Sequence, residues 1–284
     1  MRKIVLALAL SALAALPCGA QTLYMLNLPS DPRAAAMART GEINPALMVS
    51  ESRLSVKASY SKWALSGSAN PSLGVRATAC IGGKIALGAY YKSFGYSSYN
   101  VTDASGHVTG SYKPSEGDFG VYAAFKFGGK FSVGAGVHLP SSKLAEDASA
   151  KTFAVDASAA FTTKMLKVSA GVYNIGGKLS YGEQSSCALP TLAKATADVS
   201  LGIVSVCGEA GYLFGSGFTA GAGAEVSLFD AAFVRAGYRI GPSDLPSYAS
   251  FGLGGKFLGI TLDASYIVGG GLGNSLLVGA GFSF

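Results

Sequence analysis

Apolar and polar residues alternate with a period of two along most of the chain, from about residue 52 onward. In residues 54–61, Leu, Val, Ala and Tyr alternate with Ser and Lys, and residues 218–228 repeat the pattern with Gly, Thr, Glu and Ser on the second face. This period is typical of strands whose two faces meet different surroundings. It predicts about fourteen strands, near residues 52–62, 71–80, 83–93, 117–128, 130–139, 151–163, 165–174, 190–201, 203–213, 217–228, 231–240, 248–257, 259–268 and 274–284.

The connections between these predicted strands alternate in length. Residues 81–83, 128–129 and 163–164 make short turns, whereas residues 94–116, 140–150 and 175–189 make longer loops. Most predicted strands are roughly 9–12 residues long, enough to cross a bilayer when tilted. Short turns at one end and longer loops at the other are the rule in bacterial outer-membrane barrels.

Composition narrows the class of protein. Only 13% of residues are charged, 39 are glycine, and the mean hydropathy is +0.37. No apolar run after Gln21 reaches the ~18 residues of a membrane helix. The sequence therefore predicts an all-β fold, an antiparallel transmembrane β-barrel of about 14 strands in bacterial outer-membrane lipid. The excess of 22 basic over 16 acidic residues is too mild and scattered to indicate nucleic-acid binding.

The N-terminal part differs from the rest. Residues 1–20 have the basic start and short apolar run of a signal peptide, with cleavage expected before Gln21. A lipoprotein signal with Cys18 lipidated is the alternative, and Pro17 argues against it. Residues 21–51 are expected to form a plug in or under the lumen, with a short helix starting at Asp31-Pro32. Residues 52–284 form the predicted barrel.

Cleavage would leave three cysteines, so at least one stays unpaired. Cys80 and Cys207 fall in predicted strands and Cys187 in a loop. Three small residues without a framework role are the simpler interpretation. A Cys187–Cys207 bridge is the alternative.

The charged residues of the predicted strands share the face of small residues, and so are expected in the lumen. Charges there need partners or water. One hypothesis is an ion-pair network that grips the plug through Arg33 or Arg39, and the others are a polar constriction that selects a solute and catalysis by a Glu pair. The main candidates are Asp156, Asp198, Glu209, Glu225, Arg235 and Asp263; further inward charges are Lys57, Arg76, Lys92, Lys126, Lys194 and Arg239.

No residue pattern indicates an enzyme, a metal site or a cofactor. The two histidines, His107 and His138, show no spacing typical of a catalytic set or a metal site. Aromatic residues gather near predicted strand ends, which favours an interfacial girdle, with a hydrophobic-ligand patch at residues 94–99 as the alternative. These aromatic residues are Trp63, Tyr90, Tyr91, Phe94, Tyr96 and Tyr99.

Three segments, in order, resemble a known family. The first is Asp31-Pro32-Arg33-Ala-Ala-Ala-Met37 followed by Asn44-Pro45-Ala46; the others are Val172–Gly176 with Leu189-Pro190, and Val234–Tyr238. Together they look like the PorV/PorQ-like outer-membrane proteins, within the wider FadL-type barrel class. The chain departs from that pattern at residues 38–41, where a Gly-rich stretch is usual, and its loops are short.

The resemblance implies a barrel without enzymatic activity. A PorV/PorQ-type protein would serve protein secretion and surface attachment of the type IX kind, with a secretion translocon or secreted cargo protein as partner. The alternative is a FadL-like transporter that moves hydrophobic small molecules and binds a lipid-like ligand. The matched motifs favour the first function.

The terminal strand predicts how the barrel is assembled. Leu276, Val278, Ala280, Phe282 and Phe284 share one face, and we expect the two phenylalanines to act as a signal for the barrel assembly machinery. Deleting Phe284 should therefore lower the amount of folded barrel in outer-membrane fractions more than any single lumen substitution. Unchanged assembly without Phe284 would contradict this interpretation.

Overall fold

The structure is a computed structural model that describes residues 23–41, 43–64, 68–103, 105–181, 186–242, 245, 247–269 and 273–284. The predicted signal peptide lies outside the described residues. Within them, no helix is both long and apolar enough to cross a membrane.

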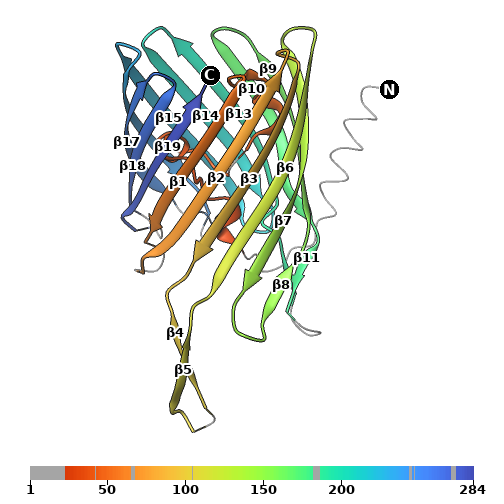
Figure 1. The fold of residues 1–284 in the computed structure, drawn as a ribbon, viewed down its shortest axis with the longest axis vertical. Helices are drawn as coiled ribbons and strands as arrows, with labels where there is room; N and C mark the ends of the chain where they lie inside the picture. The colour runs from red at the N-terminus through yellow and green to blue at the C-terminus, as the bar shows by residue number, and fades with distance from the viewer. Residues whose placement is uncertain are drawn as a thin grey trace.

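Fourteen strands of the described chain form a closed antiparallel barrel, as predicted (Figure 1). Each strand pairs with its neighbours in the chain, and β6–β7 and β1–β19 pairing leaves no open edge in the ring. The ring strands are β1 (Leu54–Trp63), β2 (Asn70–Ile81), β3 (Ile85–Gly95), β6 (Ser115–Phe127), β7 (Phe131–Lys143), β9 (Ala154–Thr162), β10 (Leu166–Gly176), β13 (Leu192–Leu201), β14 (Val204–Leu213), β15 (Gly217–Leu228), β16 (Ala232–Ile240), β17 (Tyr248–Phe257), β18 (Ile260–Val268) and β19 (Ser275–Ser283).

The two faces of the ring follow the alternation in the sequence. In β19, Leu276, Val278 and Phe282 are 42–48% exposed on the outer surface, while Ser275 and Leu277 are buried inside. The outward residues form an apolar band, and the inward face carries small and polar residues together with some large apolar ones such as Leu277. Hydrocarbon offers no hydrogen bonds, so a closed ring with this polarity satisfies every strand backbone within the sheet.

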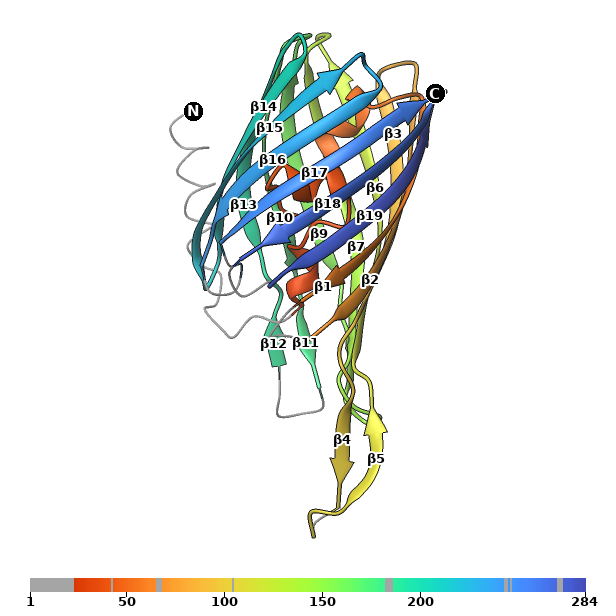
Figure 2. The same cartoon turned by 90° about the vertical axis from the view of Figure 1, so that its left-hand side faces the viewer.

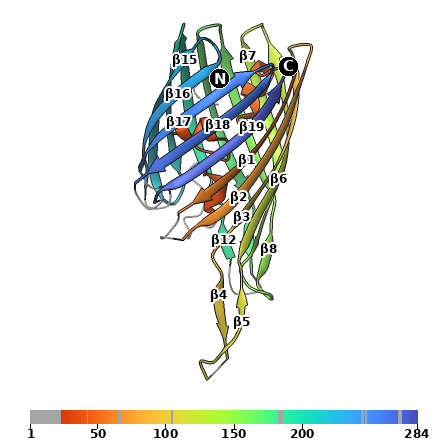
Figure 3. The ribbon, with the colours of Figure 1, turned by 60° about the vertical axis from the view of Figure 1, so that its left-hand side comes forward.

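The two ends of the barrel differ. The turn end carries the short connections, such as Gly82-Gly83 and Gly128-Gly129, whose positive φ angles suit glycine. The loop end lies opposite (Figures 1 and 3). There β4 (Tyr99–Thr102) and β5 (Val108–Tyr112) form a hairpin that projects beyond the ring, β8 (Ser149–Lys151) pairs with β7, and β11 (Lys178–Ser180) pairs with β12 (Ser186–Ala188). Cys187, expected in a loop, therefore lies in a short strand, and Cys80, Cys187 and Cys207 are all free thiols.

The described residues before β1, from Leu23 onward, run through the inside of the ring (Figure 2). It contains η1 (Tyr24–Leu26), α2 (Pro32–Ala36) and η2 (Pro45–Ser50). Asp31 caps α2, because its carboxylate accepts hydrogen bonds from the Arg33 and Ala34 amides at 2.9 and 3.2 Å. We call residues 23–50 the inner segment. Its η1 lies in the loop-end core, α2 contacts β16–β19, and η2 contacts β6, β7 and β9 nearer the turn end.

Inward glycines make room for the inner segment. A Cβ on Gly223 would lie 2.7 Å from the carbonyl oxygen of Met37, and one on Gly237 would lie 2.7 Å from that of Ala36. A Cβ on Gly134 would lie 2.5 Å from the backbone of Pro45. Real side chains do not approach so closely, so glycine at these positions lets the two backbones touch.

This fit predicts the effect of adding one methyl group. Gly223→Ala should destabilise the folded barrel by about 1–3 kcal/mol, because the new Cβ must displace the Met37 backbone. Gly208→Ala is the matched control, since a Cβ there meets nothing within 4 Å. Thermal unfolding in detergent and protease cleavage within residues 31–41 measure the effect. Equal stability of the two variants would contradict a close fit.

Candidate functional site

Charged side chains of the lumen pair with the inner segment and with one another. Arg33 of α2 donates to Glu225 of β15 at 2.7–2.8 Å, and Arg235 of β16 donates to the same carboxylate. Arg235 also donates to Asp263 of β18 at 2.6 Å. Glu225 and Arg235 face each other in the register of β15 and β16. These four groups form one network that ties α2 to three strands.

A second network surrounds Glu209 of β14, which is 6% exposed. Its carboxylate accepts hydrogen bonds from the amide and hydroxyl of Thr40, and lies 3.2 Å from Arg239 and 3.6 Å from Lys194. Arg239 Nη1 also donates to the carbonyl oxygen of Ala38 at 2.9 Å. Nearby, Arg39 pairs with Asp198. Both arginines considered from the sequence, Arg33 and Arg39, thus contact wall carboxylates.

Two lysines of the wall contact the start of the inner segment. Lys57 of β1 donates to Asp31 at 2.8 Å. Burial alone would raise the pKa of Asp31, but the positive charges of Lys57 and Arg76 outweigh it and hold the pKa below its ordinary value. Lys92 of β3 donates to the carbonyl oxygens of Met25, at 2.6 Å, and Leu28. Through these two hydrogen bonds, Lys92 holds residues 25–28, which include the end of η1, against β3.

Asp156 belongs to a third, separate cluster on β6, β7 and β9. Its carboxylate accepts from Tyr122 at 2.8 Å and from the Asn174 amide at 2.7 Å. His138 lies between Asp156 and Asp118, with ring nitrogens 3.4 and 3.0 Å from the two carboxylates. All of these side chains are at most 7% exposed, and no group of three or more His, Cys, Asp or Glu among the described residues is arranged so that it could hold a metal ion.

The residues of the family motif lie along the inner segment. Asp31, Pro32 and Arg33 begin α2, and Met37 ends it. Asn44 exchanges hydrogen bonds with Ser169 and Ser158 at 2.7 and 2.8 Å. The amide and carbonyl of Ala46 bond to Ser158 and Ser132, and Pro45 packs on Gly134. Hydroxyl groups of the barrel wall thus bind residues 44–46 of the inner segment, whereas α2 is bound by ion pairs.

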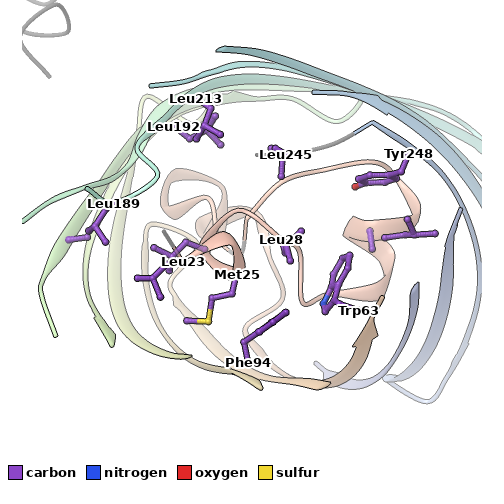
Figure 4. Close-up of a cluster of buried hydrophobic side chains, with 14 of the residues drawn as sticks. Leu23, Met25, Leu28, Trp63, Phe94, Leu189, Leu192, Leu213, Leu245 and Tyr248 are labelled. Carbon is purple, nitrogen blue, oxygen red and sulfur yellow. The ribbon is translucent and has the colours of Figure 1, made fainter. Parts of the chain in front are cut away.

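A cluster of buried apolar side chains lies in the lumen at the loop end (Figure 4). Wall side chains point inward there onto Leu23, Met25 and Leu28 of the inner segment, all at most 2% exposed. We call the part of the lumen that this packed cluster fills the loop-end chamber. Its wall residues include Trp63, Phe94, Leu192, Leu213, Tyr248, Ile267 and Leu277.

The chamber corrects the prediction of an aromatic girdle for three residues. Trp63, Tyr90 and Phe94 are 0–5% exposed and face the lumen, while Tyr91 and Tyr99 are 48% and 42% exposed outside it. The alternation along β1 already indicated this for Trp63, because Trp63 lies on the same face of the strand as Ser59 and Ser61. The contacts of Lys92 with backbone carbonyls had no signal in the sequence.

Several solved structures of bacterial proteins have a similar fold. No family model and no curated protein matches the sequence. The toluene transporter TbuX of Ralstonia pickettii superposes with a TM-score of 0.65 at 12% identity, over 92% of this chain and 100% of that one. The toluene transporter TodX of Pseudomonas putida gives 0.60 at 12% identity, over 91% and 99%. A FadL homologue of Pseudomonas aeruginosa gives 0.55 at 13% identity, over 94% and 97%.

The fold is therefore that of a FadL-type barrel. TbuX and TodX are described as transporters, and CymD, a monoaromatic hydrocarbon channel, superposes with a TM-score of 0.58 at 12% identity, over 90% of this chain and 98% of that one. At such low identity they show the fold alone, and they give no support to the PorV/PorQ branch of the predicted family over the FadL branch.

The Glu209 network predicts a large cost of neutralising one charge. Glu209→Gln should destabilise the barrel by about 3–5 kcal/mol, because Arg239 and Lys194 would remain buried without their anion. Asp230→Asn is the control, since Asp230 is exposed on a turn. Urea unfolding of the two variants in the same detergent measures the difference. Stability of Glu209→Gln within about 1 kcal/mol of the control would show that the network is not needed.

Proposed function

We propose that this protein is a non-enzymatic outer-membrane channel that admits small hydrophobic molecules. The loop-end chamber is the observation that carries the proposal. It is the larger of the two buried apolar clusters that the described residues form, and it lies at the end where the longer loops are. A water-filled pore for polar solutes has no use for such a surface, because apolar walls do not replace the hydration of a polar solute.

The occupant of the chamber supports the same function. Leu23, Met25 and Leu28 fill it in this structure, so apolar side chains take the place that an apolar ligand would occupy. Exchange of these side chains for a ligand would replace one set of apolar contacts with another. The fold agrees, since the transporters TbuX and TodX are named for toluene, and CymD for monoaromatic hydrocarbons.

The apolar outer band and the fold of outer-membrane transporters together support a place in the bacterial outer membrane.

The secretion-accessory function remains a second candidate. The N-terminal motif favours it, and so does the β4–β5 hairpin, which projects beyond the ring with Val101 and Val108 41% and 61% exposed. Affinity purification from native membranes in mild detergent should then recover a translocon or cargo protein. Repeated recovery of the barrel alone would count against that function.

The single tryptophan of the chain, Trp63, reports on the chamber. Bromobenzene, a small apolar molecule with a heavy-atom quencher, should quench Trp63 emission in a saturable way, because the ring is fully buried in the chamber wall. Bromide ion, which stays in water, should not. Quenching that rises linearly, as for a tryptophan derivative dissolved in the same micelles, would contradict a binding site.

Two methionines give a matched pair of variants for the same measurement. Met25→Ala should increase the bromobenzene affinity about 3–10-fold, because it removes apolar volume from the chamber that the ligand can fill. Met48→Ala removes the same side chain from η2, which packs with Ile43, Tyr90 and Tyr122 in a separate core, and should change little. A similar change in both variants would mean that ligand binds elsewhere or that the whole inner segment has loosened.

A further inference from the structure

We propose that the turn end of the barrel binds the headgroups of anionic phospholipids through a cationic arc. The arc consists of Arg53, Lys84, Lys130 and Lys164, and all four side chains are exposed. Arg53 leads into β1, Lys84 lies in the β2–β3 turn, Lys130 in the β6–β7 turn and Lys164 in the β9–β10 turn. These are successive positions around one side of the ring.

Backbone hydrogen bonds connect each member of the arc to the next part of the sheet. The carbonyl oxygen of Arg53 accepts from Cys80 at 2.8 Å, and that of Lys84 accepts from Lys126 at 2.7 Å. The carbonyl oxygen of Lys130 accepts from Thr162, two residues before Lys164, at 2.8 Å. The strands at this end are therefore directly joined, and the four cations follow one continuous rim.

The charge of this rim is one-sided among the described residues. Glu51 is its acidic residue, and its carboxylate is engaged with Arg76 at 3.4 Å and with Thr78 at 2.8 Å. Elsewhere on the turn end, exposed Asp230 and Lys256 are of opposite sign. The loop end carries both signs: its exposed acids are Asp103, Glu146 and Asp147, and its exposed lysines are Lys62, Lys113, Lys143, Lys151 and Lys178.

Apolar side chains fix the level of the arc in a membrane. Phe127 and Phe131 flank the turn that carries Lys130; both are about half exposed, and their ring centroids are 6.1 Å apart. Phe161 continues the row, 5.0 Å from Phe131, and Met165 next to Lys164 is 58% exposed. Aromatic side chains prefer the boundary between hydrocarbon and headgroups. Cations one or two residues beyond them then reach the phosphate groups.

The form of the cationic arc favours lipid phosphate groups as its ligands. The arc is an array of flexible point charges spread along the rim, which suits the mobile phosphates of many lipid molecules rather than one shaped ligand. Phosphatidylglycerol carries a net negative charge and phosphatidylcholine none. The arc should therefore concentrate the anionic lipid around one side of the barrel at its turn end.

The test counts lipids bound to the whole folded protein in detergent. An equimolar mixture of phosphatidylglycerol and phosphatidylcholine with identical acyl chains is added, and native mass spectrometry measures the ratio retained. The natural protein should retain the anionic lipid by at least about threefold over the neutral one, and 0.5 M salt should reduce the preference. A ratio near one, or a preference that salt leaves unchanged, would overturn the proposal.

Matched variants locate the preference. The triple variant Lys84→Gln, Lys130→Gln and Lys164→Gln should bring the ratio close to one. The control variant Lys113→Gln, Lys151→Gln and Lys178→Gln removes the same charge from the loop end and should keep it. Equal loss in both would overturn the arc. Circular dichroism and heat-dependent gel mobility establish folding, and the salt response of the natural protein decides the question if the triple variant does not fold.

Discussion

Hydrocarbon cannot solvate a polar group, and the rest of this structure depends on that constraint. It requires the strand backbones to be paired, which a sheet achieves only when β1 meets β19 and the ring closes. It also separates the residues by face, because an apolar side chain can face lipid and a charged one cannot do so cheaply. The charges in the middle of the strands are thereby directed into the lumen, whereas the outward Lys62 lies near the loop end of β1.

The lumen then has to satisfy the charges it has received, and the inner segment provides much of what it needs. Arg33 and Arg39 supply cations to Glu225 and Asp198, while the amide and hydroxyl of Thr40 reach Glu209. In return the wall offers glycines, so that the backbone from Ala36 to Ala38 lies directly against β15 and β16. Barrel and inner segment are therefore parts of a single polar core, and neither is complete alone.

The sequence predicted the ring well because the signal is local. Alternation with period two over about ten residues shows both that a strand is present and which of its faces points inward. The strand positions and the charges of the inward face could therefore be predicted without coordinates. The partners of those charges could not, since Arg33 and Glu225 are 192 residues apart in the chain. The contacts of Lys92 with backbone carbonyl groups could not be found either, because every residue has such a group and none is marked by its residue type. Trp63 is different: aromatic residues near strand ends suggested a girdle, although parity with Ser61 placed it inside.

The inner segment is held by different forces along its length, and this difference bears on transport. Near α2 it is fixed by ion pairs, in which the half-exposed Arg33 side chain meets the buried carboxylate of Glu225. A hydrophobic molecule cannot replace Arg33, because the Glu225 carboxylate would lose one of its cations. At η1 it is held by apolar packing and by Lys92 on two carbonyl groups. An apolar molecule that entered from the loop end would compete with Leu23, Met25 and Leu28 on equal chemical terms. It would have no means of competing with Arg33. Under the proposed function, the ion pairs would therefore hold the middle of the inner segment in place, and its beginning would be the part that exchanges with an apolar ligand.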